Sequence, residues 1–145
     1  MSPLPEACTI IMIEDDPGHA LLICRNLERA GISNPVLHLD DGKKAIDYFF
    51  GEGNLGLKHD NALILLDLNL PLIDGYEILR RLKEDARTKR IPVIILTTTD
   101  NPKEIDRCYA LGCNVYIVKP VEYDGFSEAI RKLGLMLAVV KLPGI

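Results

Sequence analysis

The sequence lacks any apolar segment of the length that a membrane helix needs, and it lacks an excess of positive charge. Its apolar runs are far shorter than the roughly 20 residues required to cross a bilayer, and no charged-then-apolar leader opens it. The formal net charge of −4 gives no support to non-specific nucleic-acid binding. We therefore expect a cytoplasmic protein whose partners include neither membranes nor nucleic acids.

The cysteines are not arranged for metal binding. The four cysteines form no C-x-x-C pair, and no histidine stands at a zinc-like spacing from them. We interpret them as reduced, partly buried thiols. With 145 residues, 48% of them hydrophobic, the chain is long enough to bury a core without disulfides or metals, so we expect one domain over residues 1–145.

Five short apolar runs predict strands. They are Thr9–Ile13, Val36–Leu39, Ala62–Leu66, Val93–Leu96 and Val115–Val118. Three of the runs are unbroken and rich in branched residues, which is typical of strands buried on both faces of a parallel sheet. The second run alternates through His38, which favours an edge strand.

Helix signals lie between these runs. Asp16 and Pro17 predict an N-cap and a first helical position, and Gly31 predicts the end of that helix. Further helices are expected to begin at Asp41 or Gly42, at Asp74, at Asn101 (ending at Gly112) and at Val121 or Glu122 (ending near Leu137). Strand and helix thus alternate five times, which predicts an α/β fold with a parallel sheet and helices on both faces.

The chemically informative residues all follow predicted strands. Glu14 and Asp15 follow the first strand, Asp67 the third, Thr97 the fourth and Lys119 the fifth. Because the carboxyl ends of parallel strands meet at one edge, we expect these residues to converge. Crowded carboxylates favour a hard cation such as Mg²⁺, and a lysine with a threonine suits a phosphoryl group. Each residue alone has an ordinary interpretation as a turn or cap, but their convergence favours a site.

These residues resemble the receiver domains of two-component response regulators. The resemblance rests on Glu14–Asp16, Leu65–Pro71 with Asp74–Gly75, Pro92 with Thr97, and Tyr116–Pro120. It covers about residues 8–137 and leaves a tail over residues 138–145. It implies a flavodoxin-like (βα)5 three-layer sandwich with strand order 2-1-3-4-5.

The resemblance also implies phosphotransfer chemistry. Asp67 would accept a phosphoryl group from the phosphohistidine of a sensor histidine kinase. Mg²⁺ would be held by Asp15, by Asp67, by the backbone carbonyl of Asn69 and, largely through water, by Glu14. The protein would promote its own phosphorylation and dephosphorylation rather than act as an enzyme on other substrates.

A second group of residues is implied to form the switch. Lys119 would pair with the phosphoryl group, and the Lys119–Pro120 bond would be cis. Thr97 would be the switch hydroxyl, and Tyr116 the aromatic side chain that turns inward when Thr97 is recruited. Thr98 stands where many receivers carry Ala, Gly or Ser.

A narrower resemblance concerns the partner. The loop Gly51–Asp60, the runs Asp67–Pro71 and Thr97–Thr99, and the segment Val140–Pro143 look similar to single-domain regulators paired with bacterial phytochrome kinases. This implies a stand-alone regulator of a phytochrome-like kinase. The alternative is an intermediate phosphate shuttle in a multistep phosphorelay.

Three rival functions fit the pattern less well. A dehalogenase-type phosphatase needs a general acid where this chain has Asn69. A phosphate-independent module on the same scaffold usually lacks the acids or the lysine that are present here. A nucleotide-binding domain needs a phosphate loop where Glu14–Asp16 would repel the phosphate.

The C-terminal region predicts a homodimer. Phe126, Ile130, Leu133 and Leu137 form one helical stripe that is expected to pack on the sheet. Further apolar residues lie largely off this stripe, namely Leu135, Met136, Val139, Val140 and Leu142. Apolar surface of this kind is expected to be covered, either by a second subunit or by folding back over the chain's own sheet edge.

Overall fold

The computed structural model describes residues 8–51 and 62–119, together with residues 124, 125, 128 and 131. In this part of the chain, β1 (Thr9–Ile13), β2 (Val36–Leu39), β3 (Ala62–Leu66), β4 (Val93–Thr97) and β5 (Val115–Val118) form one parallel sheet. The strand order is β2-β1-β3-β4-β5. The predicted α/β class and strand order are therefore confirmed, and β2 lies at an edge as expected.

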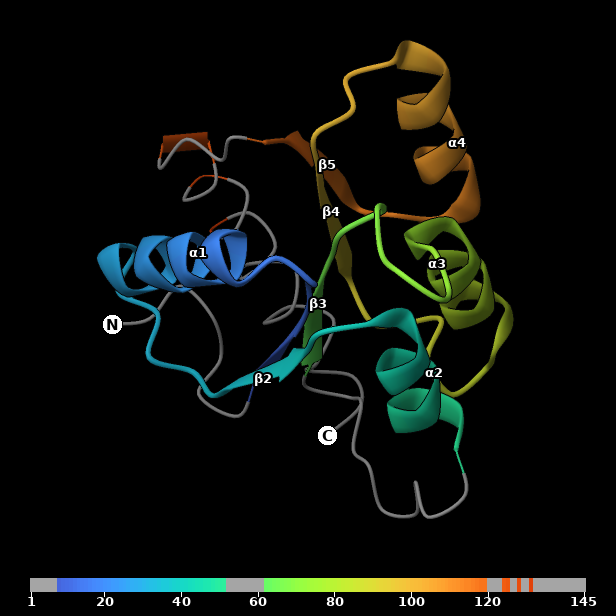
Figure 1. The fold of residues 1–145 in the computed structure, drawn as a ribbon, viewed down its shortest axis with the longest axis horizontal. Helices are drawn as coiled ribbons and strands as arrows, with labels where there is room; N and C mark the ends of the chain where they lie inside the picture. Colours follow the sequence, from blue (N-terminus) through green and yellow to red (C-terminus); the bar gives the residue numbers. More distant parts are fainter. Residues whose placement is uncertain (1–7, 52–61, 120–123, 126–127, 129–130, 132–145) are drawn as a thin grey trace.

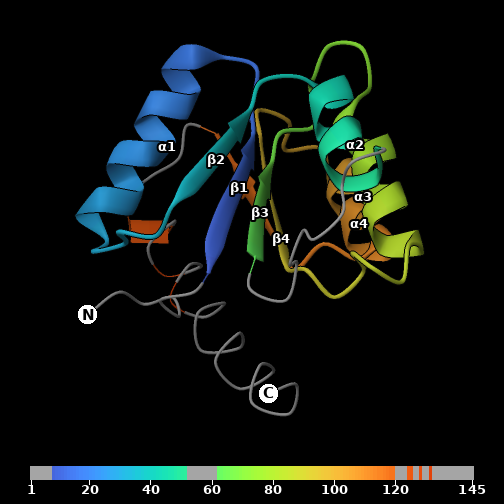
Figure 2. The ribbon, with the colours of Figure 1, turned by 90° about the horizontal axis from the view of Figure 1, so that it is seen from below.

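The helices cover both faces of the sheet. Helix α1 (Pro17–Arg29) lies on one face, and α2 (Gly42–Phe50), α3 (Gly75–Glu84) and α4 (Pro102–Leu111) lie on the other (Figures 1 and 2). The three layers that the alternation of strands and helices predicted are visible in Figure 2. None of the helices in the described ranges is both long and apolar enough to traverse a bilayer.

Alternation along the strands builds two buried clusters, because successive side chains point to opposite faces. Under α1 the strands contribute Ile10, Met12, Leu63, Leu65, Ile94 and Leu96. Under α2, α3 and α4 they contribute Ile11, Ile13, Ile64, Leu66, Val93 and Ile95. Every residue of β3 and β4 is buried, which explains their unbroken apolar sequences.

Side-chain caps set where the four described helices begin. The Asp16 carboxylate accepts hydrogen bonds from the backbone N–H groups of Gly18 and His19, at 2.8 and 3.1 Å. Asp41, Asp74 and Asn101 cap α2, α3 and α4 in the same way. These bonds satisfy donors that the first helical turn leaves without partners. Gly112 ends α4 with a φ of 111°, as the glycine signal predicted.

Some sequence-based predictions lie outside the described residues. They concern most of the fifth helix, the loop over residues 52–61, Pro120 with its cis bond, and the proposed dimer residues Leu135, Met136, Val139, Val140 and Leu142.

Helix α3 begins directly against the end of β3. The N–H group of Gly75 donates to the Leu68 carbonyl at 3.0 Å. A Cβ atom at Gly75 would collide with the Asp67 carbonyl oxygen and lie 2.6 Å from the Leu68 Cα atom. The absence of a side chain at Gly75 therefore lets α3 support the backbone of Asp67.

We predict that Gly75→Ala destabilises the fold by about 1–3 kcal/mol, because backbone atoms on both sides must move. Urea denaturation measures the change. Gly125→Ala is the matched control, since a Cβ atom there meets nothing within 4 Å. Equal stability of the two variants would contradict the close packing of α3 against β3.

Candidate functional site

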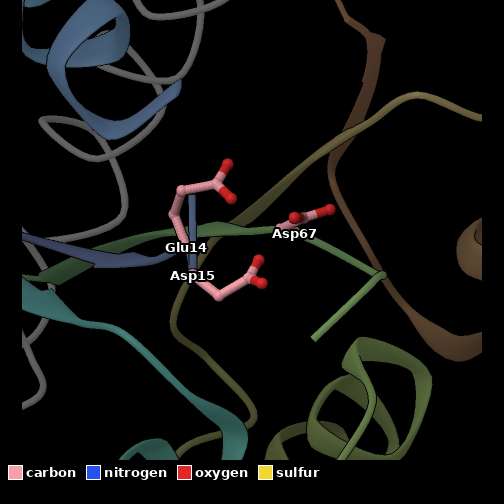
Figure 3. Close-up of side chains that lie close together, drawn as sticks. All are labelled: Glu14, Asp15 and Asp67. Carbon is pink, nitrogen blue, oxygen red and sulfur yellow. The ribbon is translucent and has the colours of Figure 1, made fainter. Parts of the chain in front are cut away.

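Three carboxylates gather at the carboxyl edge of the sheet. Glu14 and Asp15 follow β1, Asp67 follows β3, and carboxylate oxygens of all three lie within 4.8 Å of one another (Figure 3). Glu14 and Asp67 are buried, whereas Asp15 is exposed. The parallel sheet thus brings together acids that are separated by more than fifty residues in the sequence.

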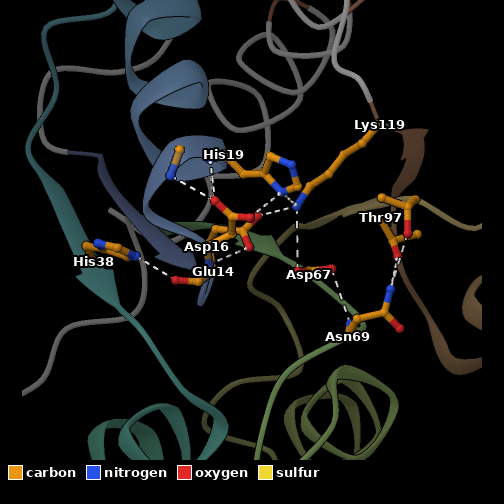
Figure 4. Close-up of polar contacts among 10 residues, drawn as sticks. Glu14, Asp16, His19, His38, Asp67, Asn69, Thr97 and Lys119 are labelled. Carbon is orange, nitrogen blue, oxygen red and sulfur yellow. Dashed lines mark hydrogen bonds and ion pairs between the residues drawn. The ribbon is translucent and has the colours of Figure 1, made fainter.

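Lys119 provides the positive charge of this site. Its ammonium group donates a short hydrogen bond to Glu14 Oε1 and lies 3.6 Å from Asp67 Oδ2 (Figure 4). Only 5% of the Lys119 side chain is exposed. The N–H group of Lys119 donates to the Thr97 carbonyl at 2.7 Å, which holds the end of β5 against β4.

The surroundings of Glu14 oppose its ionisation. Burial raises the pKa of Glu14 above its ordinary value, and the negative charge of Asp67 raises it further. The hydrogen bonds from Lys119 and from the Asp16 N–H group lower it. The net direction is upward, so repulsion and desolvation outweigh the contacts that stabilise the carboxylate.

Asn69 joins the β3–α3 loop to the end of β4. Its N–H group donates to Asp67 Oδ1 at 3.2 Å, and its side-chain amide donates to Thr97 Oγ1 at 3.3 Å (Figure 4). A longer contact of 3.4 Å reaches the exposed Thr98 hydroxyl. The Thr97 side chain is fully buried. The Thr97 hydroxyl, which the sequence predicted to be the switch, is therefore already hydrogen-bonded to Asn69 in this structure.

The comparison with known families agrees with this arrangement. The response regulator receiver domain family matches residues 10–131. The chain belongs to this family. A buried carboxylate that lies beside a lysine in an acidic cluster is the combination that the resemblance implied.

The relatives and solved structures that resemble this receiver include phytochrome-associated regulators. It is 36% identical to the response regulator Rcp1 of Synechocystis over 135 residues, 92% of each chain. A Mn²⁺-bound Rcp1 structure is similar with a TM-score of 0.71, 30% identity, and coverage of 87% of this chain and 91% of Rcp1.

Two other structures are similar over most of their length. A receiver domain from Rhodospirillum rubrum is 50% identical with a TM-score of 0.73, covering 90% of this chain and 94% of that one. The phosphorylated cyanobacterial phytochrome response regulator RcpA is 34% identical with a TM-score of 0.72, covering 87% and 90%.

Tyr116 lies half-buried on the α4 side of the receiver. Its hydroxyl donates to the Thr99 carbonyl at 2.8 Å, and its N–H group donates to the Tyr109 hydroxyl at 3.2 Å. Burial, followed by the nearby Cys108 and Glu104, raises the pKa of Tyr116 to about 12. Its hydroxyl therefore stays protonated at neutral pH and remains a donor to the loop after β4.

Sequence reasoning missed two histidines at this edge. His19 Nδ1 lies 3.0 Å from the Lys119 ammonium, and His38 Nε2 lies 2.7 Å from the Glu14 carbonyl oxygen (Figure 4). A usable signal existed for His19, because it lies in the first turn of a helix that begins at the site. His38 was interpreted only as part of an edge strand, and its sequence position contained no hint of the contact.

We predict that Asp67→Asn stabilises the receiver in metal-free buffer, because it removes a charge that opposes ionisation of Glu14. A gain of about 0.5–2 kcal/mol is expected. The raised pKa means that the folded state holds a proton on Glu14 more readily than the unfolded state. The stability from this proton is present at low pH and is lost as pH rises through the raised pKa.

The gain from Asp67→Asn should therefore be larger at a pH above the raised pKa of Glu14 than at a pH below its ordinary value of 4.5. Urea denaturation of both proteins in excess chelator measures it. Asp106→Asn, on the exposed face of α4, is the control for loss of one negative charge. A gain that is equal at both pH values, or a loss of stability, would count against repulsion between the two carboxylates.

Proposed function

We propose that this receiver accepts a phosphoryl group on Asp67 from the phosphohistidine of a sensor histidine kinase. One observation carries the proposal: the buried Asp67 carboxylate belongs to the acidic cluster and lies 3.6 Å from the Lys119 ammonium. The family membership and the phosphorylated state of the related RcpA structure support it.

The transfer is a nucleophilic displacement at phosphorus. A carboxylate oxygen of Asp67 attacks, and a P–O bond forms while the P–N bond of the phosphohistidine breaks. The electron pair of that bond stays on the imidazole nitrogen of the kinase. Lys119 is placed to pair with an oxygen of the transferred group, which offsets the charge that accumulates there.

The donor set fits a hard divalent cation. Three carboxylates share a small region, and the repulsion that raises the pKa of Glu14 is the condition that a cation relieves. Asp15, Asp67 and the Asn69 carbonyl would hold Mg²⁺, with Glu14 acting through water. Bound Mg²⁺ would neutralise phosphoryl oxygens during transfer. Rcp1, which binds Mn²⁺ in its solved structure, supports this assignment.

The signal is proposed to pass through Thr97. Its hydroxyl would leave the Asn69 amide and turn toward the phosphoryl group, and Tyr116 would follow. The contact between the Tyr116 hydroxyl and the Thr99 carbonyl supports this route, because it ties the aromatic ring to the loop directly after Thr97.

The partner is proposed to be a phytochrome-like kinase, with the receiver acting as a stand-alone regulator in the cytoplasm. The likeness to Rcp1 and RcpA over nearly their whole lengths supports this partner. The four free cysteines are consistent with a reducing compartment. An intermediate role in a phosphorelay is the alternative, and a second phosphotransfer protein that removes the group from Asp67 would favour it.

We predict that acetyl phosphate and Mg²⁺ convert the protein to a hydroxylamine-sensitive acyl phosphate. Asp67→Asn should abolish this adduct because the nucleophile is gone, and intact-mass spectrometry measures the added phosphoryl group. Asp15→Ala or excess chelator should also prevent labelling, while the circular dichroism spectrum stays unchanged.

Asp106→Asn is the matched control and should label as the wild type does. Labelling of Asp67→Asn to the wild-type extent would disprove the assignment of the phosphoacceptor. Undiminished labelling in excess chelator would disprove the role of the cation instead.

We further propose that the protein forms a homodimer through the apolar C-terminal residues identified in the sequence. Sedimentation velocity of the intact chain and of a chain truncated after Leu137 tests this. The intact protein should dimerise and the truncated one should not. A monomeric intact protein at tens of micromolar, roughly the range of weak regulatory contacts, with and without phosphorylation, would refute it.

A further inference from the structure

The Lys119 ammonium has three partners in the described part of the site, two within hydrogen-bonding distance and one, Asp67, at ion-pairing distance. It has three N–H donors, and the neighbouring acceptors are Glu14 Oε1, His19 Nδ1 at 3.0 Å and Asp67 Oδ2 at 3.6 Å. The two nearer partners both lie on the β1–α1 side of the site (Figure 4). In the resting protein the ammonium group therefore lies closer to Glu14 and His19 than to the proposed phosphoacceptor.

His19 is held in place by the beginning of α1. Its N–H group donates to the carboxylate of the N-cap residue Asp16 at 3.1 Å, which fixes the first helical turn. An ammonium group has donors only, so the 3.0 Å contact is a hydrogen bond only when Nδ1 carries a lone pair. The Asp16 Oδ2 atom, 3.8 Å from the same Nδ1, is too far away to accept a proton from it. The proton of the neutral ring is then on Nε2. Since 43% of the side chain is exposed, the Nε2–H group does not need a protein partner.

The contact matters because Lys119 is buried. Only 5% of its side chain is exposed, so water is a poor substitute for a lost acceptor. If His19 no longer accepts, the freed N–H group can turn to Asp67 Oδ2, which among the described residues is already within ion-pairing distance. The position of the ammonium group thus depends on whether His19 accepts a hydrogen bond.

We propose that His19 is a positioning residue that holds Lys119 back from Asp67 in the resting receiver. This inference rests on the proposed function, in which Lys119 pairs with the phosphoryl group on Asp67. For that pairing the ammonium group must approach Asp67, so its bond to His19 competes with its bond to the phosphoryl oxygens. His19 therefore lowers the readiness of the site to accept a phosphoryl group.

The first test uses amides that mimic one ring nitrogen each. The Oδ1 atom of Asn occupies the position of Nδ1, whereas the Oε1 atom of Gln reaches the position of Nε2. His19→Ala and His19→Gln are expected to react with acetyl phosphate several-fold faster than wild type, mainly through a lower half-saturating concentration. His19→Asn should restore the wild-type rate. Helix propensity or packing alone would not separate Asn from Gln in this way.

The second test does not require phosphorylation. Nitrogen-15 NMR of the histidine rings in the presence of chelator should show His19 in the Nε2–H tautomer. In Lys119→Met, the fraction of His19 in this tautomer should fall. His38 is the internal control, because its Nε2 atom faces a carbonyl oxygen and should keep the Nε2–H tautomer in both proteins.

The outcomes are distinguishable. Wild-type protein that does not label at Asp67 would defeat the proposed function, while the tautomer would still report the contact. An Nδ1–H tautomer of His19, an unchanged tautomer in Lys119→Met, or equal rates for wild type and His19→Ala would overturn the positioning role.

Discussion

The buried contact between Lys119 and Glu14 is the interaction on which the site depends. Their side chains are 5% and 1% exposed, and a charge buried to this degree is costly unless it is paired and hydrogen-bonded. Glu14 receives hydrogen bonds from the ammonium group and from the Asp16 N–H group. Without this pairing, the edge of an almost wholly apolar sheet would hold two buried carboxylates with little to offset their repulsion.

Because of the strand order, the Lys119 side chain that reaches Glu14 also comes close to Asp67. Lys119 and Glu14 are 105 positions apart in the sequence and follow strands that are not neighbours, because β3 and β4 lie between β1 and β5. The long lysine side chain spans this distance along the sheet edge. Asp67, which follows β3, therefore lies within ion-pairing distance of the ammonium group. The strand order reverses between β1 and β3, and open parallel sheets bind their ligands at such a point.

Local signals predicted most of the fold, and long-range geometry accounts for what they missed. The strand runs and the caps at Asp16, Asp74 and Asn101 depend on neighbouring residues, so the sequence alone revealed them. The convergence of acids and Lys119 followed from the single assumption of a parallel sheet.

Contacts that depend on the direction of individual side chains were not predictable. The bonds from Asn69 to Thr97 and from Lys119 to His19 require rotamers that packing selects. Leu72, in the loop between β3 and α3, adopts a φ of 73°, against the preference of a leucine. No local sequence signal predicted this backbone conformation.

The resting site is already hydrogen-bonded at the two groups that are proposed to bind the phosphoryl group. Thr97 accepts from Asn69, and Lys119 donates to Glu14 and His19. Phosphorylation would therefore exchange hydrogen bonds rather than add them, and an exchange of this kind changes the free energy by far less than the formation of new bonds. A small difference between two states is what a reversible switch requires, since each must be reachable from the other. The same polar contacts that stabilise the unphosphorylated receiver would thus keep the two proposed states close in free energy.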